Sequence, residues 1–358
     1  MINVTRTYLP PMEEYTRYLE KIWETNQLTN YGPLVKDLEH KLIEYLGVRH
    51  LFFVANGTVA LQIAIKAAGL SGEVLTTPFS YVATTSSLVW ENCRPVFVDI
   101  HPLTLTIDPD LMEAAITPQT TGLLATHVYG YPCALERIQQ IAEKHHLKVI
   151  YDAAHTFGVR YKNTALVNYG DISALSFHAT KIFHTGEGGA LVTNDDELAG
   201  RIQYMMNFGH KGYEEFEGLG INGRNSELHA AMGLCVLPKV PQLIAGRKQI
   251  CDLYDRLLAG APLARPVLPP ETDPNYAYYP VLFESEAALL KAKAALNKKA
   301  IYPRRYFYPS LNGLPYIHAQ PMKVSEQVSP RILCLPLSNY LTAEEVHLIS
   351  ATLMASLG

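Results

Sequence analysis

The chain has 358 residues, which is long enough to bury more than one hydrophobic core, so we expect a large domain and a smaller one. With 48% hydrophobic and 18% charged residues, its composition is that of a globular protein and excludes a disordered chain. The formal net charge of −4 and the lack of a dense basic run exclude the electrostatic footprint usual in nucleic-acid-binding proteins.

The cysteines and the N-terminus bear on the cellular compartment. Five cysteines are spread widely, without a C-x-x-C pair or zinc spacing, which fits a reducing compartment and no bound metal. Residues Met1–Pro11 lack the features of a signal peptide, and no apolar run approaches the roughly 20 residues needed to cross a bilayer. We therefore expect a cytoplasmic protein that does not enter a membrane.

The chain begins with two predicted helices, after which short apolar runs alternate with helical segments. Glu13–Thr25 and Leu34–Leu46 carry apolar residues at helical spacing, and Gly47 is suited to end the second helix. The predicted strands that follow are Leu51–Val54, Val74–Thr77, Pro95–Val98, Gly122–Thr126, Lys148–Tyr151 and Asp171–Phe177. The predicted helices among them are Val59–Ala68, Tyr81–Trp90, Pro109–Ile116 and Ala134–His145. This alternation is typical of a mainly parallel sheet with helices on both faces.

The C-terminal part of the chain has a different pattern. The next predicted helices are Asp195–Asn207, Ser226–Leu237, which we expect Pro238 and Pro241 to stop, and Val240–Leu258. Further on we predict strands at Tyr278–Phe283 and Arg331–Leu335 and helices at Glu286–Lys298 and Ala343–Leu357. The expected architecture is an α/β protein with a large domain at residues 1–240 and a small α+β domain at residues 241–358.

Two of the predicted strands lead into ionisable residues, at the position where open α/β sheets place their chemistry. Lys181 has small and apolar neighbours, where burial would lower the pKa of its amine and make it nucleophilic. Position alone favours an ordinary surface lysine. Asp152, at the end of a buried strand, needs a partner such as a protonated pyridine nitrogen, although a lone aspartate there is more often a cap. Together the two residues form the pair that pyridoxal phosphate requires.

Further residues could complete such a site. Gly57 and Thr58, between a predicted strand and a predicted helix, could bind a phosphate at the helix N-terminus, although the same sequence is also a common turn. Ser176 offers another hydroxyl. Tyr81 could stack on a flat ring, and His155 could position the ring or its phenolic oxygen. Core aromatic residues and structural histidines are common alternative explanations for these two.

Taken together, these residues resemble a known family. The segments Asn56–Thr58, Asp152–His155, Ser176–Lys181, Glu187–Gly189 and Gly220–Leu228 are similar, in order and spacing, to DegT/StrS-type nucleotide-sugar aminotransferases. That family is a branch of the fold-type I pyridoxal phosphate enzymes, and the resemblance covers nearly the whole chain. It implies a large domain with a mainly parallel seven-stranded sheet and a smaller C-terminal domain. The implied cofactor is pyridoxal 5'-phosphate, which becomes pyridoxamine 5'-phosphate during the reaction.

The resemblance implies a role for each matching residue. Lys181 would bind the cofactor covalently and move the proton, and Asp152 would pair with the pyridine nitrogen. The other implied cofactor contacts are Tyr81 on the ring, Gly57, Thr58 and Ser176 at the phosphate, His155 near the phenolic oxygen, and Asn222 from the partner subunit. A homodimer with shared sites is therefore implied. The candidate substrate-binding residues are Tyr31, His184, Arg224 and Tyr308.

The implied reaction moves an amino group from glutamate to a nucleotide-linked keto sugar. Pro78–Thr84 and Arg305–Pro309 are most similar to members that aminate C4 of a dTDP-4-keto-6-deoxyhexose. Their product is dTDP-4-amino-4,6-dideoxyglucose, and the resemblance implies its use in surface polysaccharide, such as lipopolysaccharide O-antigen, or in a glycosylated product. Members that aminate C3 of a 3-keto-6-deoxyhexose share the cofactor motifs and form the alternative.

Three other interpretations are weaker. A sister class that removes a hydroxyl has histidine at the lysine position, which Lys181 argues against. A non-catalytic regulatory protein of the same fold would have no reason to keep Lys181, Asp152 and Ser176 together. A nicotinamide oxidoreductase would need G-x-G-x-x-G after the first strand, and this motif is missing.

Overall fold

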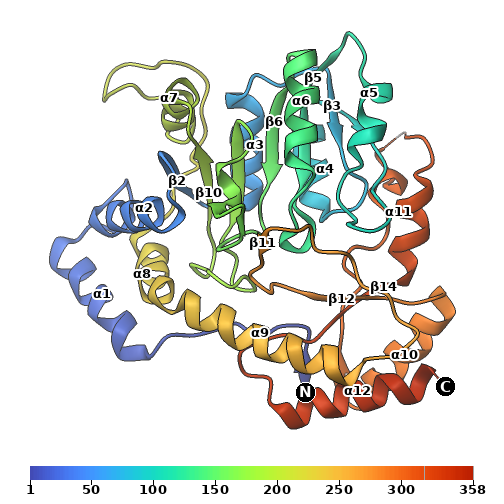
Figure 1. Ribbon diagram of the computed structural model, residues 1–358. Helices are drawn as coiled ribbons and strands as arrows, with labels where there is room; N and C mark the ends of the chain where they lie inside the picture. The colour runs from blue at the N-terminus through green and yellow to red at the C-terminus, as the bar shows by residue number, and fades with distance from the viewer. Residues whose placement is uncertain (318, 358) are drawn as a thin grey trace.

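The computed structural model describes residues 1–317 and 319–357, and its centre is a seven-stranded sheet (Figure 1). The strands are β2 (His50–Val54), β3 (Glu73–Thr76), β4 (Arg94–Phe97), β5 (Thr120–Thr126), β6 (Lys148–Asp152), β9 (Ile172–Ser176) and β10 (Gly189–Thr193). Their order is β2-β10-β9-β6-β5-β3-β4. Only β10 runs antiparallel to its two neighbours, and the other pairs are parallel. The predicted α/β fold with a mainly parallel sheet of seven strands is confirmed.

Helices cover both faces of this sheet. They are α3 (Gly57–Ala67), α4 (Val82–Trp90), α5 (Met112–Ala115), α6 (Leu135–His145) and α7 (Asp196–Met205). Because successive side chains along a strand point to opposite faces of the sheet, side chains of β6 pack in two separate cores. Val149 and Tyr151 pack in the core under α6, whereas Ile150 packs in the core under α3 on the opposite face (Figure 1). The near-continuous apolar character of β6 follows from this burial on both sides.

Three helices form a layer beside the sheet: α1 (Met12–Thr25), α2 (Pro33–Leu46) and α8 (Glu227–Val236). They share one core with β2 and β10. Gly47 ends α2 in the left-handed region with φ 59°, as predicted. The buried carboxylate of Glu227 accepts hydrogen bonds from the N–H groups of Leu34 (2.8 Å) and Val35 (2.9 Å), which caps the first turn of α2 from a distant part of the chain.

The helices predicted at Ser226–Leu237 and Val240–Leu258 are present, and the first ends at Val236, shortly before Pro238, but no loop separates them. α8 continues through a short 3₁₀ turn, Leu237–Lys239, into α9 (Val240–Leu257), giving 31 consecutive helical residues. Both prolines occupy first-turn positions, where a missing N–H costs no intrahelical hydrogen bond. This stretch is long and apolar enough to cross a membrane, yet half of its most apolar window is buried inside the fold, as in a core helix. A cytoplasmic location stays a prediction.

The C-terminal part has its own core. β12 (Tyr279–Leu282) pairs antiparallel with β14 (Ile332–Leu335), and α10 (Glu286–Lys298) and α12 (Ala343–Leu357) pack beside them. Cys251 and Tyr254 of α9 join this core, whereas Val240 and Leu243 join the core of the N-terminal helices. Because α9 thus links two cores, it lies where the predicted boundary falls, and the division near residue 240 itself stays a prediction.

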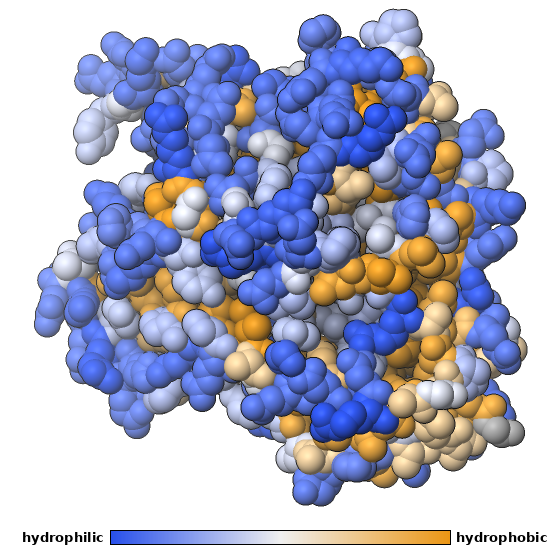
Figure 2. Space-filling view, viewed as in Figure 1, coloured by the Kyte–Doolittle hydropathy of each residue, from blue (hydrophilic) through white to orange (hydrophobic). Residues whose placement is uncertain are grey.

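Several short elements carry no pattern that sequence reasoning could detect. They are β1 (Ile2–Asn3), β7 (Arg160–Tyr161), β8 (Thr164–Ala165), β11 (Thr272–Asp273), β13 (Ile301–Tyr302) and α11 (Lys323–Val328). β1 pairs in parallel with β13, so the N-terminus joins the C-terminal part of the fold. On the face seen in Figure 2, polar and apolar side chains are interspersed rather than gathered in one apolar band.

Candidate active site

A cavity of ≈ 710 Å³ lies at the carboxyl ends of β6 and β9 and beside the N-terminus of α3. Seven of the eight predicted cofactor residues line it: Gly57, Thr58, Tyr81, Asp152, His155, Ser176 and Lys181. The sheet therefore brings together residues that are up to 124 positions apart, as expected at the carboxyl ends of parallel strands.

Asp152 is the last residue of β6 and is only 5% exposed. Its Oδ2 accepts a hydrogen bond from Thr84 Oγ1 at 2.6 Å, and its Oδ1 accepts one from the N–H of Ala154 at 3.1 Å. Burial raises the pKa of this carboxyl above its usual value, and these two hydrogen bonds and the charge of Lys181 oppose that shift. The result is a buried acid with lone pairs still available for a cation in the cavity.

Lys181 lies in the turn that follows β9, and its Nζ is 3.4 Å from the hydroxyl of Tyr278. Burial lowers the pKa of the amine to about 8, against the opposing charge of Asp152. A larger fraction of the amine is therefore neutral near physiological pH than for an exposed lysine. A neutral amine is what attack on a carbonyl group requires.

The N-terminus of α3 can hold an anion. The side chain of Asn56 accepts a hydrogen bond from the N–H of Val59 at 2.9 Å, which starts the helix. The N–H groups of Gly57 and Thr58 have no partner within the helix, as in any first turn. A Cβ at position 57 would lie 3.0 Å from Ser176 Cβ, so glycine allows the helix start to approach the end of β9.

His155 is held as a neutral ring. The N–H of Tyr129 donates to its Nδ1 at 3.2 Å, so the ring hydrogen is on Nε2. Burial holds its pKa well below the usual value. The ring stacks on Phe307 with centroids 5.7 Å apart and meets Tyr278 edge-on at 4.9 Å. Tyr81, by contrast, stays exposed at the rim of the cavity, where α4 begins.

Sequence reasoning missed three residues around these groups. Thr84 bonds to Asp152, Tyr278 approaches Lys181, and Asn275 donates to the carbonyl oxygens of His155 (2.8 Å) and Phe157 (2.9 Å). Thr84 lies within the segment after Pro78 that carries the family resemblance, which is a signal that could have found it. Tyr278 and Asn275 are about a hundred residues away from their partners along the chain, and no local pattern indicates them.

All four candidate substrate-binding residues lie outside the lining of this cavity, and three of them have partners elsewhere in the chain. The hydroxyl of Tyr31 donates to the buried carboxylate of Glu39. His184 has partners on both ring nitrogens, with Nε2 2.6 Å from the carbonyl oxygen of Tyr8 and Nδ1 accepting from the N–H of Gly186. Tyr308 lies under the guanidinium of Arg305. Their roles at the sugar stay predictions that this placement does not support.

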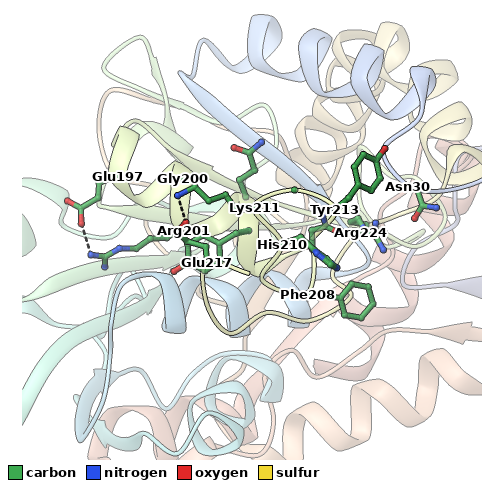
Figure 3. A pocket seen from close by; sticks show the side chains of 14 residues that line it. Asn30, Glu197, Gly200, Arg201, Phe208, His210, Lys211, Tyr213, Glu217 and Arg224 are labelled. Carbon is green, nitrogen blue, oxygen red and sulfur yellow. Dashed lines mark hydrogen bonds and ion pairs between the residues drawn. The ribbon is translucent and has the colours of Figure 1, made fainter. Parts of the chain in front are cut away.

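Arg224 lines a second cavity of ≈ 1030 Å³ between α7 and the loop at residues 208–223 (Figure 3). Its guanidinium is 3.4 Å from Asn222 Oδ1 and 5.4 Å from the ring centroid of Phe208. The ion pairs Arg201–Glu197 and Lys211–Glu217 lie at the same cavity. Asn222 is exposed and does not line the first cavity.

The residues of the first cavity fit pyridoxal phosphate. A buried acid is available for the pyridine nitrogen, an amine of lowered pKa for the aldehyde, a helix N-terminus for the phosphate, and a rim tyrosine for the ring face. In the described part of the chain, no cluster of three or more metal-ligating side chains is found. This fold and this site define a pyridoxal-phosphate-dependent enzyme.

Comparison with known proteins gives the family. Residues 11–354 match the DegT/DnrJ/EryC1/StrS aminotransferase family, and the chain belongs to this family. It is 42% identical, over 98% of both chains, to a dTDP-4-amino-4,6-dideoxy-D-glucose transaminase of Shigella dysenteriae. The predicted family and enzyme class, a nucleotide-sugar aminotransferase, are confirmed.

Solved structures agree with this assignment. The fold matches DesI in the presence of its TDP-sugar product with a TM-score of 0.94 and 31% identity, over 99% of this chain and 92% of that one. It also matches NtdA from Bacillus subtilis with bound cofactor PMP, with a TM-score of 0.89 and 28% identity, over 96% and 81% of the two chains. The predicted cofactor is confirmed.

Proposed function

We propose that this chain transfers the amino group of glutamate to C4 of a dTDP-4-keto-6-deoxyhexose, giving dTDP-4-amino-4,6-dideoxyglucose or a close relative. The observation that carries the proposal is the pairing of buried Asp152 with Lys181 in one cavity. The relative from Shigella dysenteriae, whose name gives this sugar, supports the choice of C4 and of the nucleotide.

Each residue of the cavity would have a defined task. Pyridoxal phosphate, when bound, supplies an electron sink that stabilises negative charge at the carbon losing a proton. Asp152 would hold the pyridine nitrogen protonated through a charge-assisted hydrogen bond. The N–H groups of Gly57 and Thr58 and the hydroxyl of Ser176 would bind the phosphate and so fix the cofactor in register with Lys181.

Lys181 would move the proton. Its Nζ can accept a proton from the α-carbon of the amino donor because burial brings its pKa to about 8, and it can then return that proton. The hydroxyl of Tyr278, 3.4 Å away, restrains the position of Nζ. Burial raises the pKa of Tyr278, so this group stays a neutral phenol that can donate a hydrogen bond without competing as a base.

A homodimer with shared sites is part of the proposal. Asn222 does not line the cavity of its own chain, so a contact with the phosphate would have to come from a second copy. The loop that carries it exposes five large apolar side chains: Phe208, Tyr213, Phe216, Leu219 and Ile221. Such a cluster is uncommon on a monomer and supports an interface there.

The experiment that tests the proposal is incubation of the purified protein with pyridoxal phosphate, glutamate and dTDP-4-keto-6-deoxyglucose, followed by NMR of the sugar product. We expect a primary amine at C4 and release of 2-oxoglutarate. A parallel reaction with the 3-keto isomer serves as the matched control. Amination of only the 3-keto isomer would overturn the proposed position and leave the aminotransferase class in place, whereas no amination of either sugar would overturn the substrate class.

A further inference from the structure

Four buried polar side chains form one continuous hydrogen-bonded row that ends at Asp152. Thr126 Oγ1 is 3.0 Å from Ser80 Oγ, which is 2.7 Å from Thr84 Oγ1. Thr84 Oγ1 is in turn 2.6 Å from Asp152 Oδ2. None of the four residues is more than 5% exposed. Thr126 belongs to β5, Ser80 precedes α4, Thr84 lies in α4 and Asp152 ends β6. The row therefore connects four parts of the fold through hydrogen bonds that end at one carboxyl group.

The hydrogens in this row can all point the same way. A hydroxyl has one hydrogen to donate, and an ionised carboxylate can only accept. Thr84 therefore donates to Asp152, which obliges Ser80 to donate to Thr84 and Thr126 to donate to Ser80. In the reverse direction a protonated Asp152 would donate, and the hydrogen of Thr126 would need another acceptor. The described residues offer none, so the row fits the ionised form of Asp152.

We propose that Thr84, supported by Ser80 and Thr126, is a positioning residue that keeps Asp152 ionised and fixes the direction of its carboxylate toward the cavity. This inference rests on the proposed role of Asp152 as the partner of the pyridine nitrogen. The buried hydroxyl of Tyr278 also lies within electrostatic reach of the carboxylate, and burial keeps it neutral by raising its pKa. Two further groups that face the carboxylate are the N–H of Ala154 and the charge of Lys181. Both favour the ionised form, but neither comes from the α4 side of the cavity.

The physical need for such a row follows from burial. A carboxylate that is removed from water tends to take up a proton, and a neutral acid could not hold the ring nitrogen in its protonated form. Hydrogen bonds to the charged form oppose this tendency, and hydroxyls in series polarise one another in a medium of low dielectric constant. Thr84 makes the direct contact, while Ser80 and Thr126 set the direction of its hydrogen.

The test uses three variants on one helix. Thr84→Val keeps the shape of the side chain and removes the hydroxyl, whereas Thr84→Ser keeps the hydroxyl. Thr85→Val is the matched control, because Thr85 is also fully buried and its hydroxyl has no partner among the described residues. Two readouts besides turnover apply: the ¹³C carboxyl shift of Asp152 against pH in the apoprotein, and the visible absorbance of the bound cofactor against pH.

We expect Thr84→Val to raise the pH at which Asp152 takes up its proton and to shift the midpoint of the cofactor absorbance change upward. We expect kcat to fall by about 10- to 100-fold, the usual cost of one hydrogen bond to a charged group, with little change in KM. Thr84→Ser should restore all three values, and Thr85→Val should alter none of them. Thr126→Val, at the far end of the row, should shift both midpoints in the same direction by less, and it serves if Thr84→Val does not fold.

Unchanged midpoints in both Thr84→Val and Thr126→Val would overturn the inference, as would an equal shift in Thr85→Val. Failure of the proposed function has a different signature. If Asp152→Asn leaves the cofactor absorbance unchanged, then Asp152 does not face the cofactor. The apoprotein titration would still report whether the row controls the protonation of Asp152.

Discussion

The cavity around Lys181 and the loop at residues 208–223 are held in place by different means. Around Asp152 and His155, the polar side chains are buried and bonded to partners within the same chain. In the loop, large apolar side chains face solvent, and the ion pair Lys211–Glu217 lies largely exposed. The printed contacts of the first region are made within one chain, whereas the second region has the character expected of a surface that a second subunit covers.

Lys181→Ala should have the largest effect on turnover, because it removes the one amine among the described residues that line the cavity. We expect turnover to fall by more than about 1000-fold, since both the covalent link and the proton carrier are lost. Borohydride reduction followed by mass spectrometry measures the link directly. The adduct should vanish from Lys181→Ala and persist in Lys162→Ala, a variant of an exposed lysine paired with Glu136. An adduct that survives in Lys181→Ala would place the nucleophile elsewhere.

A pH titration of the apoprotein compares the buried amine of Lys181 with the exposed amine of Lys162 and requires no turnover. Burial lowers the pKa of Lys181 to about 8, whereas the hydrogen bond that Lys162 donates to Glu136 holds the pKa of Lys162 above its usual value. Acylation by an amine-reactive reagent should therefore begin at lower pH for Lys181 than for Lys162. Mass spectrometry of the two peptides, at pH values spanning about 6 to 11, measures the acylation rates of Lys181 and Lys162 in the same sample. Equal pH dependence would contradict the burial of Lys181.

Sequence alone predicts the features of this structure that neighbouring residues specify, and it misses contacts between segments that lie far apart along the chain. The alternation of strands and helices indicates the parallel sheet, and the ends of β6 and β9 indicate Asp152 and Lys181, because one strand and the next few residues specify each position. Thr84, Tyr278 and Asn275 were missed because each contact joins segments 68 to 120 residues apart. Only the packed fold brings such pairs together.

The lack of a loop at Pro238 and Pro241 was not predicted either, for a related reason. Proline stops a helix when it removes an N–H that the helix needs, and sequence alone does not show which turn it occupies. Here each proline falls in the first turn of the next helical segment, so α8, the 3₁₀ turn and α9 follow without a loop. The short strands β7, β8 and β11 were missed because two residues show no alternation.

Asn222→Ala tests the loop at residues 208–223, and its effect on cofactor retention should be intermediate in size among these variants. If Asn222 donates to the phosphate in the partner's site, its loss should weaken retention of the cofactor by about tenfold, the cost of one charged hydrogen bond. Equilibrium dialysis followed by absorbance measures this retention. Asn207→Ala, which changes the residue opposite Asn222 in the loop, is the matched control.

Mixed dimers decide whether the site is shared. When subunits with Asn222→Ala pair with subunits carrying Lys181→Ala, one of the two sites should regain every wild-type residue. We then expect about half of the wild-type turnover per mixed dimer, as the two-fold symmetry of a shared site requires. Turnover that stays at the level of the two parent variants would place Asn222 in its own chain's site or in none.

Glu39→Gln should have the smallest effect on turnover, and it probes a buried contact between α2 and β2. Tyr31, which is partly exposed, donates its hydroxyl to Glu39, whose carboxylate also accepts from the N–H of Phe53 at 2.7 Å. Burial raises the pKa of Glu39 from 4.5 to about 7, so between these values the folded protein holds a proton that the unfolded chain has released. The free energy of unfolding contributed by this group therefore falls as pH rises through that window.

A glutamine at position 39 cannot titrate but can still accept from Phe53. We expect the loss of stability between pH 5 and pH 8 to shrink by on the order of 1 kcal/mol, measured by urea unfolding at both pH values. Glu44→Gln, an exposed position on the same helix, should leave that difference unchanged. If Glu39→Gln and Glu44→Gln behave alike, then Glu39 is ionised in the folded protein at neutral pH. In that case Tyr31 is held by a charged acceptor, which would anchor its loop more firmly than a neutral acid would.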